Sequence, residues 1–396
     1  MMKKIIIAVL VVLSAALNSE AKKQSSPLLV WDLDYLQSVK TDVAFRSDKA
    51  AFIKRADKVL GEPMYCVTAK EPKLFAPDKH EYVSVGPYWW PDPKNPDGPY
   101  IRRDGVVNQA MRKADNSAEF GKTISKLKAL SVAFFLTGES KYRDVWLEQL
   151  RVWFLNPDTY MRPDLEYGQV VPGQNGNKGR CYGLIEMYAF NGALESYRLM
   201  EYASRIPADV AEGFHKWVSD FADWMWTSEL GQKEYNGYNN HATAYDVTLF
   251  DLCIFCGKKE LADKISSELK SRRLDTQIEP DGSQPKELAR TRAMHYSLYN
   301  AGHIVDFCTM QQRLGNRFYK QNQAVLDSIF LFLYPYIKDH DAFMAKYKQI
   351  GSWSGLDEKF FSCVRRLKAL EKPEKGLGGI DSSNGTPYDD YLMSCK

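Results

Sequence analysis

The chain of 396 residues lacks the features that mark several common kinds of protein. Its charge is nearly balanced, with 53 Lys and Arg against 50 Asp and Glu, and no long block of like charges occurs. A nucleic-acid-binding protein normally carries a basic stripe, so the balance argues against such a partner while leaving room for a local basic cleft. Beyond the first 17 residues, no stretch is apolar enough to predict a transmembrane helix.

The short motifs of several enzyme classes are also absent. The sequence has no H-E-x-x-H zinc motif, no G-x-S-x-G nucleophile elbow and no phosphate-binding P-loop. Its six His are scattered without metal-ligand spacing, so we expect no metal and no cofactor. The seven Cys are an odd number, which leaves at least one unpaired. Cys253 and Cys256 form a C-x-x-C inside an apolar helical pattern, which favours buried thiols over a redox or zinc site.

The N-terminus has the pattern of an export signal. Lys3 and Lys4 precede an apolar run, Ile5 to Leu17, that is too short to cross a membrane comfortably. We therefore expect residues 1–21 to be a signal peptide that is cleaved after Ala21. The mature chain is expected to be periplasmic or secreted, to make no membrane contact after cleavage, and to be a monomer.

The remaining chain is a succession of helical patterns without a convincing run of alternating strands. Long irregular segments cover residues 61–116 and 157–182. Paired antiparallel helices predict an all-α fold, an incomplete α/α toroid of about six or seven helical hairpins with irregular loops lining a cleft. We expect one domain over residues 22–396, with a loosely ordered tail from about residue 374. The helical patterns lie at 32–60, 120–136, 142–154, 183–202, 208–229, 241–256, 258–271, 286–314, 319–336 and 357–370.

A polar turn runs from Tyr235 to His241. Asn and Gly favour a tight turn here, and a helical pattern begins directly afterwards. Asn240 is therefore predicted near a helix N-cap, with His241 in the first turn. The positive end of the helix dipole disfavours an imidazolium, so a neutral His241 is suited to accept a proton. Taken by itself, this motif is explained slightly better by a capping Asn beside a structural His than by a catalytic role.

A second polar group lies between Arg290 and Tyr299. Arg292 and Tyr299 are seven residues apart, so a helix would point them in the same direction. His295 lies between them on that face and His303 follows one turn later. Such a stripe suits a polar cleft, and an exposed or hydrogen-bonded surface stripe is the equal alternative.

Aromatic residues and arginines gather in the first irregular segment. Three prolines stiffen the loop around the aromatics. Tyr and Trp rings can stack on pyranose rings, and arginines can hold carboxylates in bidentate fashion. A structural plug on the core explains the segment equally well. The candidates are Tyr88, Trp89, Trp90, Arg102 and Arg103.

The second irregular segment offers weaker candidates. Residues 166–183 form a polar loop that can line a cleft, with Gln169 and Arg180 as the side chains of interest. An ordinary surface loop is the better interpretation of this stretch by itself.

Together these pieces resemble the alginate lyase family of helical-toroid polysaccharide lyases. The matching pieces are Asn239-Asn240-His241, the Arg292-x6-Tyr299 spacing, and the segment from Trp-Trp-Pro-Asp-Pro to Arg-Arg-Asp-Gly-Val-Val-Asn, all within about residues 60–335. The last piece is most similar to the branch called polysaccharide lyase family 38, whose members act on glucuronan and alginate. One departure is Ala242-Thr243-Ala244-Tyr245, where relatives often have Gly and an aromatic.

The resemblance implies an incomplete α/α toroid that cleaves an anionic uronate polysaccharide by β-elimination and leaves 4,5-unsaturated ends. It implies that Asn240 neutralises the substrate carboxylate, that Arg292 lies on the carboxylate side, and that His241 and Tyr299 are catalytic. Tyr245 and His295 join the loop residues as expected substrate-binding side chains.

Two other functions remain open. A toroidal glycoside hydrolase needs two opposed carboxylic acids, and Asp246, Glu186 and Glu287 are available, although their spacing pairs none of them. A non-catalytic binding protein for acidic glycans would explain the aromatics and arginines without a role for Tyr299.

Overall fold

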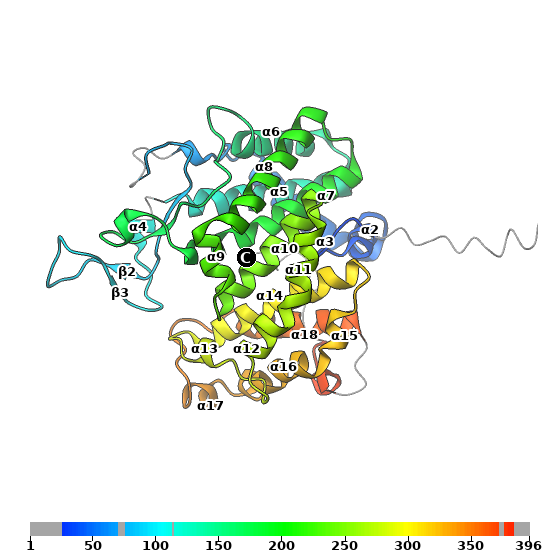
Figure 1. Cartoon of the computed structure of the whole chain (residues 1–396). Coiled ribbons are helices and arrows are strands. Elements are labelled where there is room, and N and C mark those ends of the chain that lie inside the picture. The colour runs from blue at the N-terminus through cyan, green and yellow to red at the C-terminus, as the bar shows by residue number, and fades with distance from the viewer. Residues whose placement is uncertain (1–25, 70–75, 113–114, 372–375, 384–396) are drawn as a thin grey trace, which may run out of the picture.

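The structure, a computed structural model, describes residues 26–69, 76–112, 115–371 and 376–383. Helices dominate it and surround a helical centre, which confirms the predicted all-α toroidal class (Figure 1). The expected signal peptide lies outside the described residues, as does Cys395. No helix in the described ranges is long and apolar enough to cross a membrane.

The first half of the chain combines long helices with short irregular elements. In order, it contains α2 (Leu33–Thr41), η1 (Val43–Phe45), α3 (Arg46–Leu60), η2 (Val67–Ala69), β1 (Val83–Val85), β2 (Trp89–Trp90), β3 (Ile101–Arg102), α4 (Gln109–Arg112), α5 (Ser117–Thr137), α6 (Ser140–Phe154), β4 (Tyr167–Val170), η3 (Asn175–Asn177), η4 (Cys181–Phe190) and α7 (Asn191–Ala203).

The second half is almost entirely helical. It contains α8 (Ala208–Thr227), α9 (Glu229–Tyr235), α10 (Asn240–Cys256), α11 (Lys259–Leu269), η5 (Lys270–Leu274), α12 (Asp275–Gln277), α13 (Pro285–Leu288), α14 (Ala293–Arg313), α15 (Phe318–Gln321), α16 (Gln323–Lys338), α17 (His340–Met344), α18 (Leu356–Leu370) and η6 (Gly376–Gly379).

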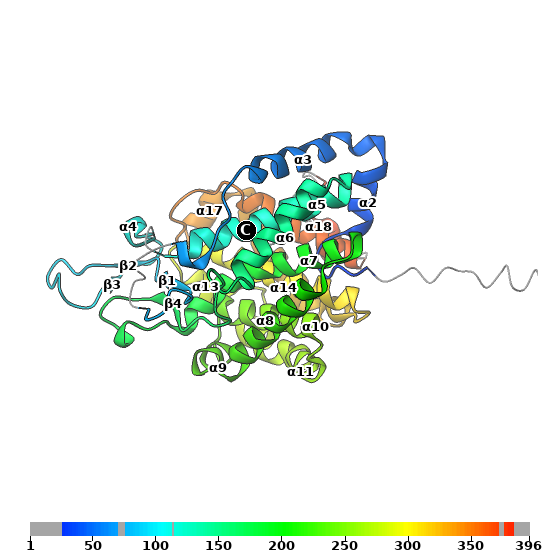
Figure 2. The same cartoon turned by 90° about the horizontal axis from the view of Figure 1, so that it is seen from above.

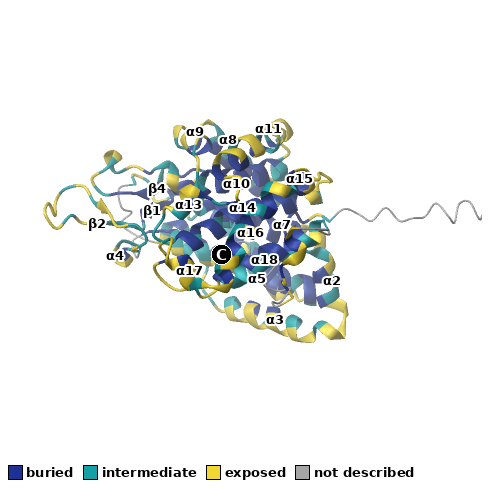
Figure 3. Ribbon diagram, turned by 90° about the horizontal axis from the view of Figure 1, so that it is seen from below, coloured by how far each residue is buried: buried dark blue, intermediate teal, exposed yellow. Residues whose placement is uncertain are grey.

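Three helices, α5, α10 and α14, form the inside of the molecule. Their apolar residues lie on all sides of the helix, a composition typical of a fully buried helix, and nearly every residue of α10 as far as Cys253 is buried. Helix α10 packs on α8, α11 and α14, and α14 packs on α18. Figure 3 shows this buried interior against the exposed outer faces of α3 and α11. The N-terminal ends of α10 and α14 are therefore held within one rigid interior.

The helix predicted over residues 286–314 is interrupted at 289–292, and the reason is tertiary. The Thr291 backbone N–H donates to the Asp104 carboxylate at 3.2 Å instead of to a carbonyl of its own helix. The chain next to it forms an isolated bridge between Arg292 and Gln349. The short α13 therefore ends at Leu288, and α14 begins at Ala293 rather than including Arg292.

The irregular segments contain four short strands that the sequence did not predict. Strand β1 pairs in parallel with β4, and β2 pairs antiparallel with β3 at one end of the molecule (Figure 2). Strands of two to four residues are too short to show alternation. Gly183 lies so close to Gly168 that an added Cβ would be 2.5 Å from a Gly168 backbone atom. This close approach fixes β4 against the start of η4.

The described part of the C-terminal segment packs on the core, while most of the expected loosely ordered tail lies outside the described residues. In the described stretch 376–383, Leu377 and Ile380 are buried in the main core, and η6 packs on α16 and α18. The Lys368 ammonium donates to the Ile380 carbonyl at 2.6 Å. The Gly, Asp and Ser residues around them hid these two apolar anchors in the sequence.

The cysteines described are all free thiols. Cys253 is buried and Cys256 is half-buried on α10, which confirms the prediction of thiols within a helix. Burial raises the pKa of the Cys253 thiol to about 12, so this thiol stays protonated near neutral pH.

A buried carboxylate anchors the N-terminal segment on the core. The Glu195 side chain on α7 accepts hydrogen bonds from the backbone N–H groups of Leu29, Val30 and Trp31 at 2.8 to 3.0 Å. Arg198 donates to Glu195 at 2.9 Å and to Asp251 at 2.6 Å, so the carboxylate is also paired with a charge.

We expect Glu195→Ala to lower the free energy of unfolding by about 3 to 5 kcal/mol, because three buried donors lose their acceptor. Urea denaturation followed by circular dichroism measures this change. Glu201→Ala, on the exposed face of the same helix, is the matched control and should change stability by less than about 0.5 kcal/mol. Equal stability of the two variants would contradict the anchoring role.

Candidate active site

The predicted catalytic residues meet where α10 and α14 begin. Asn239 caps α10, because its side-chain oxygen accepts from the His241 backbone N–H at 3.1 Å. Asn240 and His241 are therefore the first two residues of α10. Burial and the nearby Lys359 ammonium lower the pKa of His303, and the Asn240 backbone opposes this effect. His303 thus links the start of α10 to the face of α14 that carries Tyr299.

Glu287 holds Asn240 in place. The Asn240 backbone N–H donates to one oxygen of the Glu287 carboxylate at 2.8 Å, and its Nδ2 donates to the other at 2.6 Å. Both residues are buried, and the Asn240 Oδ1 has no hydrogen-bond partner among the described residues. The amide is thus fixed by Glu287, and its Nδ2 keeps a second hydrogen that these bonds do not use.

His241 is half-buried in a cation-rich environment. Its ring lies edge-on to Tyr182, with 5.3 Å between ring centroids, and its Nδ1 has no partner among the described residues. Burial, followed by the charges of Arg290 and Arg180, lowers the pKa of His241 to about 3. The lowered pKa agrees with the predicted neutral imidazole. Its causes are burial and the arginine charges, whereas the prediction from the sequence relied on the helix dipole.

Arg292 precedes the first turn of α14. Its backbone is non-helical, with φ −122° and ψ 57°, so it flanks the helix and does not lie two full turns along it from Tyr299. The Arg292 Nε is buried and has no partner among the described residues. Burial, followed by the Arg292 charge, lowers the pKa of His295 to about 4. Arg292 therefore supplies an available cation beside a neutral histidine.

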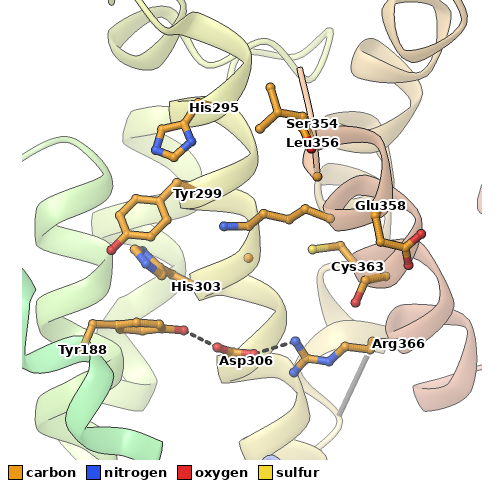
Figure 4. Close-up of a pocket in the computed structure, with 14 residues that line it drawn as sticks. Tyr188, His295, Tyr299, His303, Asp306, Ser354, Leu356, Glu358, Cys363 and Arg366 are labelled. Carbon is orange, nitrogen blue, oxygen red and sulfur yellow. Dashed lines mark hydrogen bonds and ion pairs between the residues drawn. The ribbon is translucent and has the colours of Figure 1, made fainter. Parts of the chain in front are cut away.

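Tyr299 faces a pocket of about 360 Å³ between α14 and α18. Figure 4 shows His295, Tyr299 and His303 in a column along one face of α14. The Tyr299 ring is stacked with His295 at 5.9 Å and meets His303 edge-on at 4.3 Å between centroids. His295, Tyr299 and His303 of the predicted polar stripe thus line a cavity, whereas Arg292 is not among its lining residues.

The aromatic and arginine loops approach the same place from the other side. The Arg180 guanidinium lies 5.1 Å from the centroid of Trp89 and 5.4 Å from that of Tyr182. Tyr88 shares a 2.7 Å hydrogen bond between hydroxyls with Tyr296 of α14. These contacts connect Tyr88, Trp89 and Arg180 to the His241 environment.

Asp104 ties the loop that follows β3 to the segment before α14. Its carboxylate accepts from Arg290 at 2.7 Å, from the Thr291 hydroxyl at 2.9 Å and from Arg102 at 2.6 Å. Burial alone would raise the pKa of Asp104, but the hydrogen bonds from Arg290 and Thr291 outweigh it and hold the pKa well below its usual range. The loop is thereby held by a charge that persists at all ordinary pH values.

Several predicted substrate-binding residues lie elsewhere. Tyr245 is only 1% exposed, and its hydroxyl donates to the Met225 carbonyl at 2.7 Å, so it is a core residue and does not face the cleft. Gln169 is buried, and its backbone carbonyl accepts from Arg180 at 3.0 Å. Trp90 and Arg103 stack on each other on the β2–β3 hairpin.

The carboxylates that a hydrolase would need do not form an opposed pair. Glu287 is bonded to Asn240, and Asp246 forms a buried ion pair with Arg273 at 2.8 Å. Glu186 accepts from the Tyr82 hydroxyl at 2.7 Å. Within the described ranges, no group of three or more His, Cys, Asp or Glu side chains is placed to hold a metal ion.

The sequence did not single out two residues of the site. Tyr182 reaches His241 from η4, and Lys359 lies 4.8 Å from the centroid of the Tyr299 ring, on α18. Tyr182 belongs to the polar loop at residues 166–183. Lys359 lies more than twenty positions after the segment that resembles the alginate lyase family, and no local motif marks it. Only the packing of α18 on α14 brings Lys359 to the site.

A helical toroid whose cation-rich site combines an amide, a neutral His and a Tyr has the arrangement of a polysaccharide lyase, and comparison with known proteins agrees. The family model described as alginate lyase matches residues 67–343. A crystal structure of an alginate lyase from Bacteroides ovatus is 34% identical, covers 93% of this chain and 98% of its own, and superposes with a TM-score of 0.86. The chain belongs to the alginate lyase family.

More distant structures share the fold. Alginate lyase A1-III from Sphingomonas species A1 is 15% identical over 93% of this chain and 96% of its own, with a TM-score of 0.56. A variant of that enzyme, complexed with a tetrasaccharide, is 16% identical with a TM-score of 0.55. None of the curated proteins matches the chain.

We expect the imidazole of His241 to stay neutral between about pH 8 and pH 5 in the folded protein, because burial and the arginines oppose its charge. Imidazole NMR on selectively labelled histidine measures this, with His241→Gln to assign the resonance. In urea the same ring should take up a proton near its reference pKa of about 6.5. Since only the unfolded chain gains this proton, His241 lowers the stability of the fold as the pH falls below about 6.5. Titration of the folded-state resonance near 6.5 would contradict the assignment.

Proposed function

We propose that this protein cleaves an anionic uronate polysaccharide by β-elimination at Asn240, His241, Arg292 and Tyr299. The observation that carries the proposal is that the first three have buried polar atoms without partners among the described residues, beside the tyrosine that faces the pocket. The alginate lyase family supports the reaction class.

The first task of the site is to neutralise a carboxylate. The C5 proton of a uronate is a poor acid because the neighbouring carboxylate is already negative. Arg292 supplies a positive charge, and Asn240, held by Glu287, supplies an oriented amide. Groups fixed in this way stabilise the enolate-like charge as it develops, which is often the largest catalytic effect.

The second task is to move two protons. Tyr299 is suited to protonate the departing O4 oxygen, and its phenolate form is suited to remove the C5 proton from the same side of the ring. His241, neutral and half-buried, is suited to accept the C5 proton where it lies on the opposite side. His241 otherwise positions the substrate.

We propose mannuronate-rich alginate as the preferred polymer and glucuronan as the second candidate. Mannuronate and glucuronate share the configuration at C4 and C5, so both present the C5 proton and O4 on one side of the ring. Support for alginate comes from the relative described as an alginate lyase, and support for glucuronan comes from the resemblance of the Trp89–Arg103 region to polysaccharide lyase family 38. We also propose that the enzyme acts as a monomer after export to the periplasm or medium.

We expect incubation with polymannuronate or glucuronan to produce ultraviolet absorbance, because elimination creates a C4–C5 double bond conjugated with the carboxylate. The assay compares polymannuronate, polyguluronate and glucuronan, and sizes the products by chromatography. Reducing ends without absorbance would indicate a hydrolase. Binding without either product would indicate a glycan-binding protein, and both results contradict the proposal.

We expect Tyr299→Phe to lower kcat at least about a hundredfold with little change in KM, because the acid is removed while the ring remains. Tyr202→Phe, at an exposed position on α7, is the matched control and should keep full activity. Initial rates of absorbance increase measure both variants. Normal turnover of the Tyr299 variant would remove this residue from the mechanism.

A further inference from the structure

Lys359 brings an ammonium group to the pocket side of Tyr299. It lies in the first turn of α18, and its Nζ is 4.8 Å from the centroid of the Tyr299 ring. The family model ends at residue 343, so this lysine comes from outside the matched segment. The packing of α18 on α14 places it there.

Helix α14 leaves room for this side chain at Gly302. A Cβ at that position would lie 3.3 Å from the Lys359 Cε and 3.7 Å from its Nζ. The end of the lysine therefore lies directly against the helix, one turn from Tyr299. Because Gly302 has no side chain, the half-buried end of Lys359 packs directly on α14, so packing fixes its position.

No close carboxylate neutralises Lys359 within the described part of the chain. Glu358 pairs with Arg365 at 2.6 Å, and Asp306 pairs with Arg366 at 2.6 Å while also accepting from Tyr188. Figure 4 shows the Tyr188–Asp306–Arg366 connection below the pocket. The nearby acids are thus paired with arginines. Burial lowers the pKa of Lys359, and the Cys363 thiol and the Asp306 charge oppose this effect.

The two histidines on that face respond to the lysine. His295 and His303 lie four residues before and four after Tyr299, on the same side of α14. Burial lowers the pKa of both, and the Lys359 charge lowers them further, after the Arg292 charge in the case of His295. Because the histidines are neutral, the positive charges that act on this face come from Lys359 on α18 and from Arg292 and Arg290, which precede α14. The Asp306 carboxylate on α14 and the Cys363 thiol on α18 are the other titratable groups beside the lysine.

We propose that Lys359 is a positioning residue that stabilises the phenolate form of Tyr299, so that one residue serves as base and then as acid. This inference rests on the proposed function. The phenolate takes the C5 proton as the C5–H bond breaks, and the electron pair moves toward the carboxylate in an enolate-like intermediate. This electron pair forms the C4–C5 double bond only when O4 departs. The resulting phenol then gives its proton to O4 as the C4–O4 bond breaks, which regenerates the phenolate. The positive charge of Lys359, whose Nζ lies 4.8 Å from the centroid of the Tyr299 ring, favours the phenolate over the neutral phenol.

The direct test measures the ionisation of Tyr299 without substrate. Ultraviolet difference titration of each protein against its Tyr299→Phe counterpart isolates the phenolate of this residue. We expect Lys359→Met to raise the Tyr299 pKa by at least about one unit and Lys359→Arg to restore most of the difference. Lys216→Met on the exposed face of α8 is the matched control and should leave the titration unchanged. If Lys359→Met does not fold, Lys359→Gln removes the same charge.

The kinetic test follows kcat and KM against pH on the polymer that the wild-type protein cleaves. Since the base must be a phenolate, Lys359→Met should shift the rising limb of kcat to higher pH by about the same amount. This lowers kcat about tenfold near neutral pH with little change in KM, and activity recovers at high pH.

Two results would overturn the role of Lys359. One is an unchanged Tyr299 titration in Lys359→Met. The other is a raised KM with an unchanged pH profile, which would make the lysine a ligand of a substrate carboxylate. Failure of the proposed function is recognisable separately, because a wild-type protein without lyase activity can still show the lysine-dependent titration.

Discussion

The site depends on the short segment Glu287–Arg292, which is bound from three directions. Glu287 holds the start of α10 through Asn240, and Asp104, in the loop that follows β3, holds Arg290 and Thr291. The bridge to Gln349 holds the residue that precedes α14. These bonds replace the helical hydrogen bonds that the sequence pattern favours here. They fix the backbone that carries the Asn240 amide, the His241 imidazole and the Arg292 guanidinium. Buried hydrogen bonds to charged groups are strong enough to enforce such a local departure from helix.

A consistent electrostatic arrangement surrounds this segment. Arginines and a lysine line the cleft, while burial keeps the histidines among them neutral. Positive charge therefore comes from the arginines and the lysine, while the neutral histidines remain able to accept a proton. A polyanion is attracted to such a cleft even though the chain as a whole carries a formal charge of only +3.

Sequence reasoning identified the helical fold and the two main polar groups because both rest on local patterns. The turn before His241 and the stripe of Arg292, His295 and Tyr299 are visible within ten residues. The break before Ala293 was not predictable, because its cause is a carboxylate nearly two hundred positions away. Tyr245 was misassigned, since helical neighbours of a catalytic residue face the core as readily as the cleft. Lys359 was missed because only tertiary packing relates it to Tyr299.

Helix α18 forms one wall of the pocket, and it follows α10 and α14 in the chain. During synthesis it therefore becomes available for folding after these two helices. Until it docks on α14, the cavity beside Tyr299 is an open surface and Arg366 is separated from Asp306. The order of translation thus allows the centre of the toroid to assemble before α18 completes the pocket.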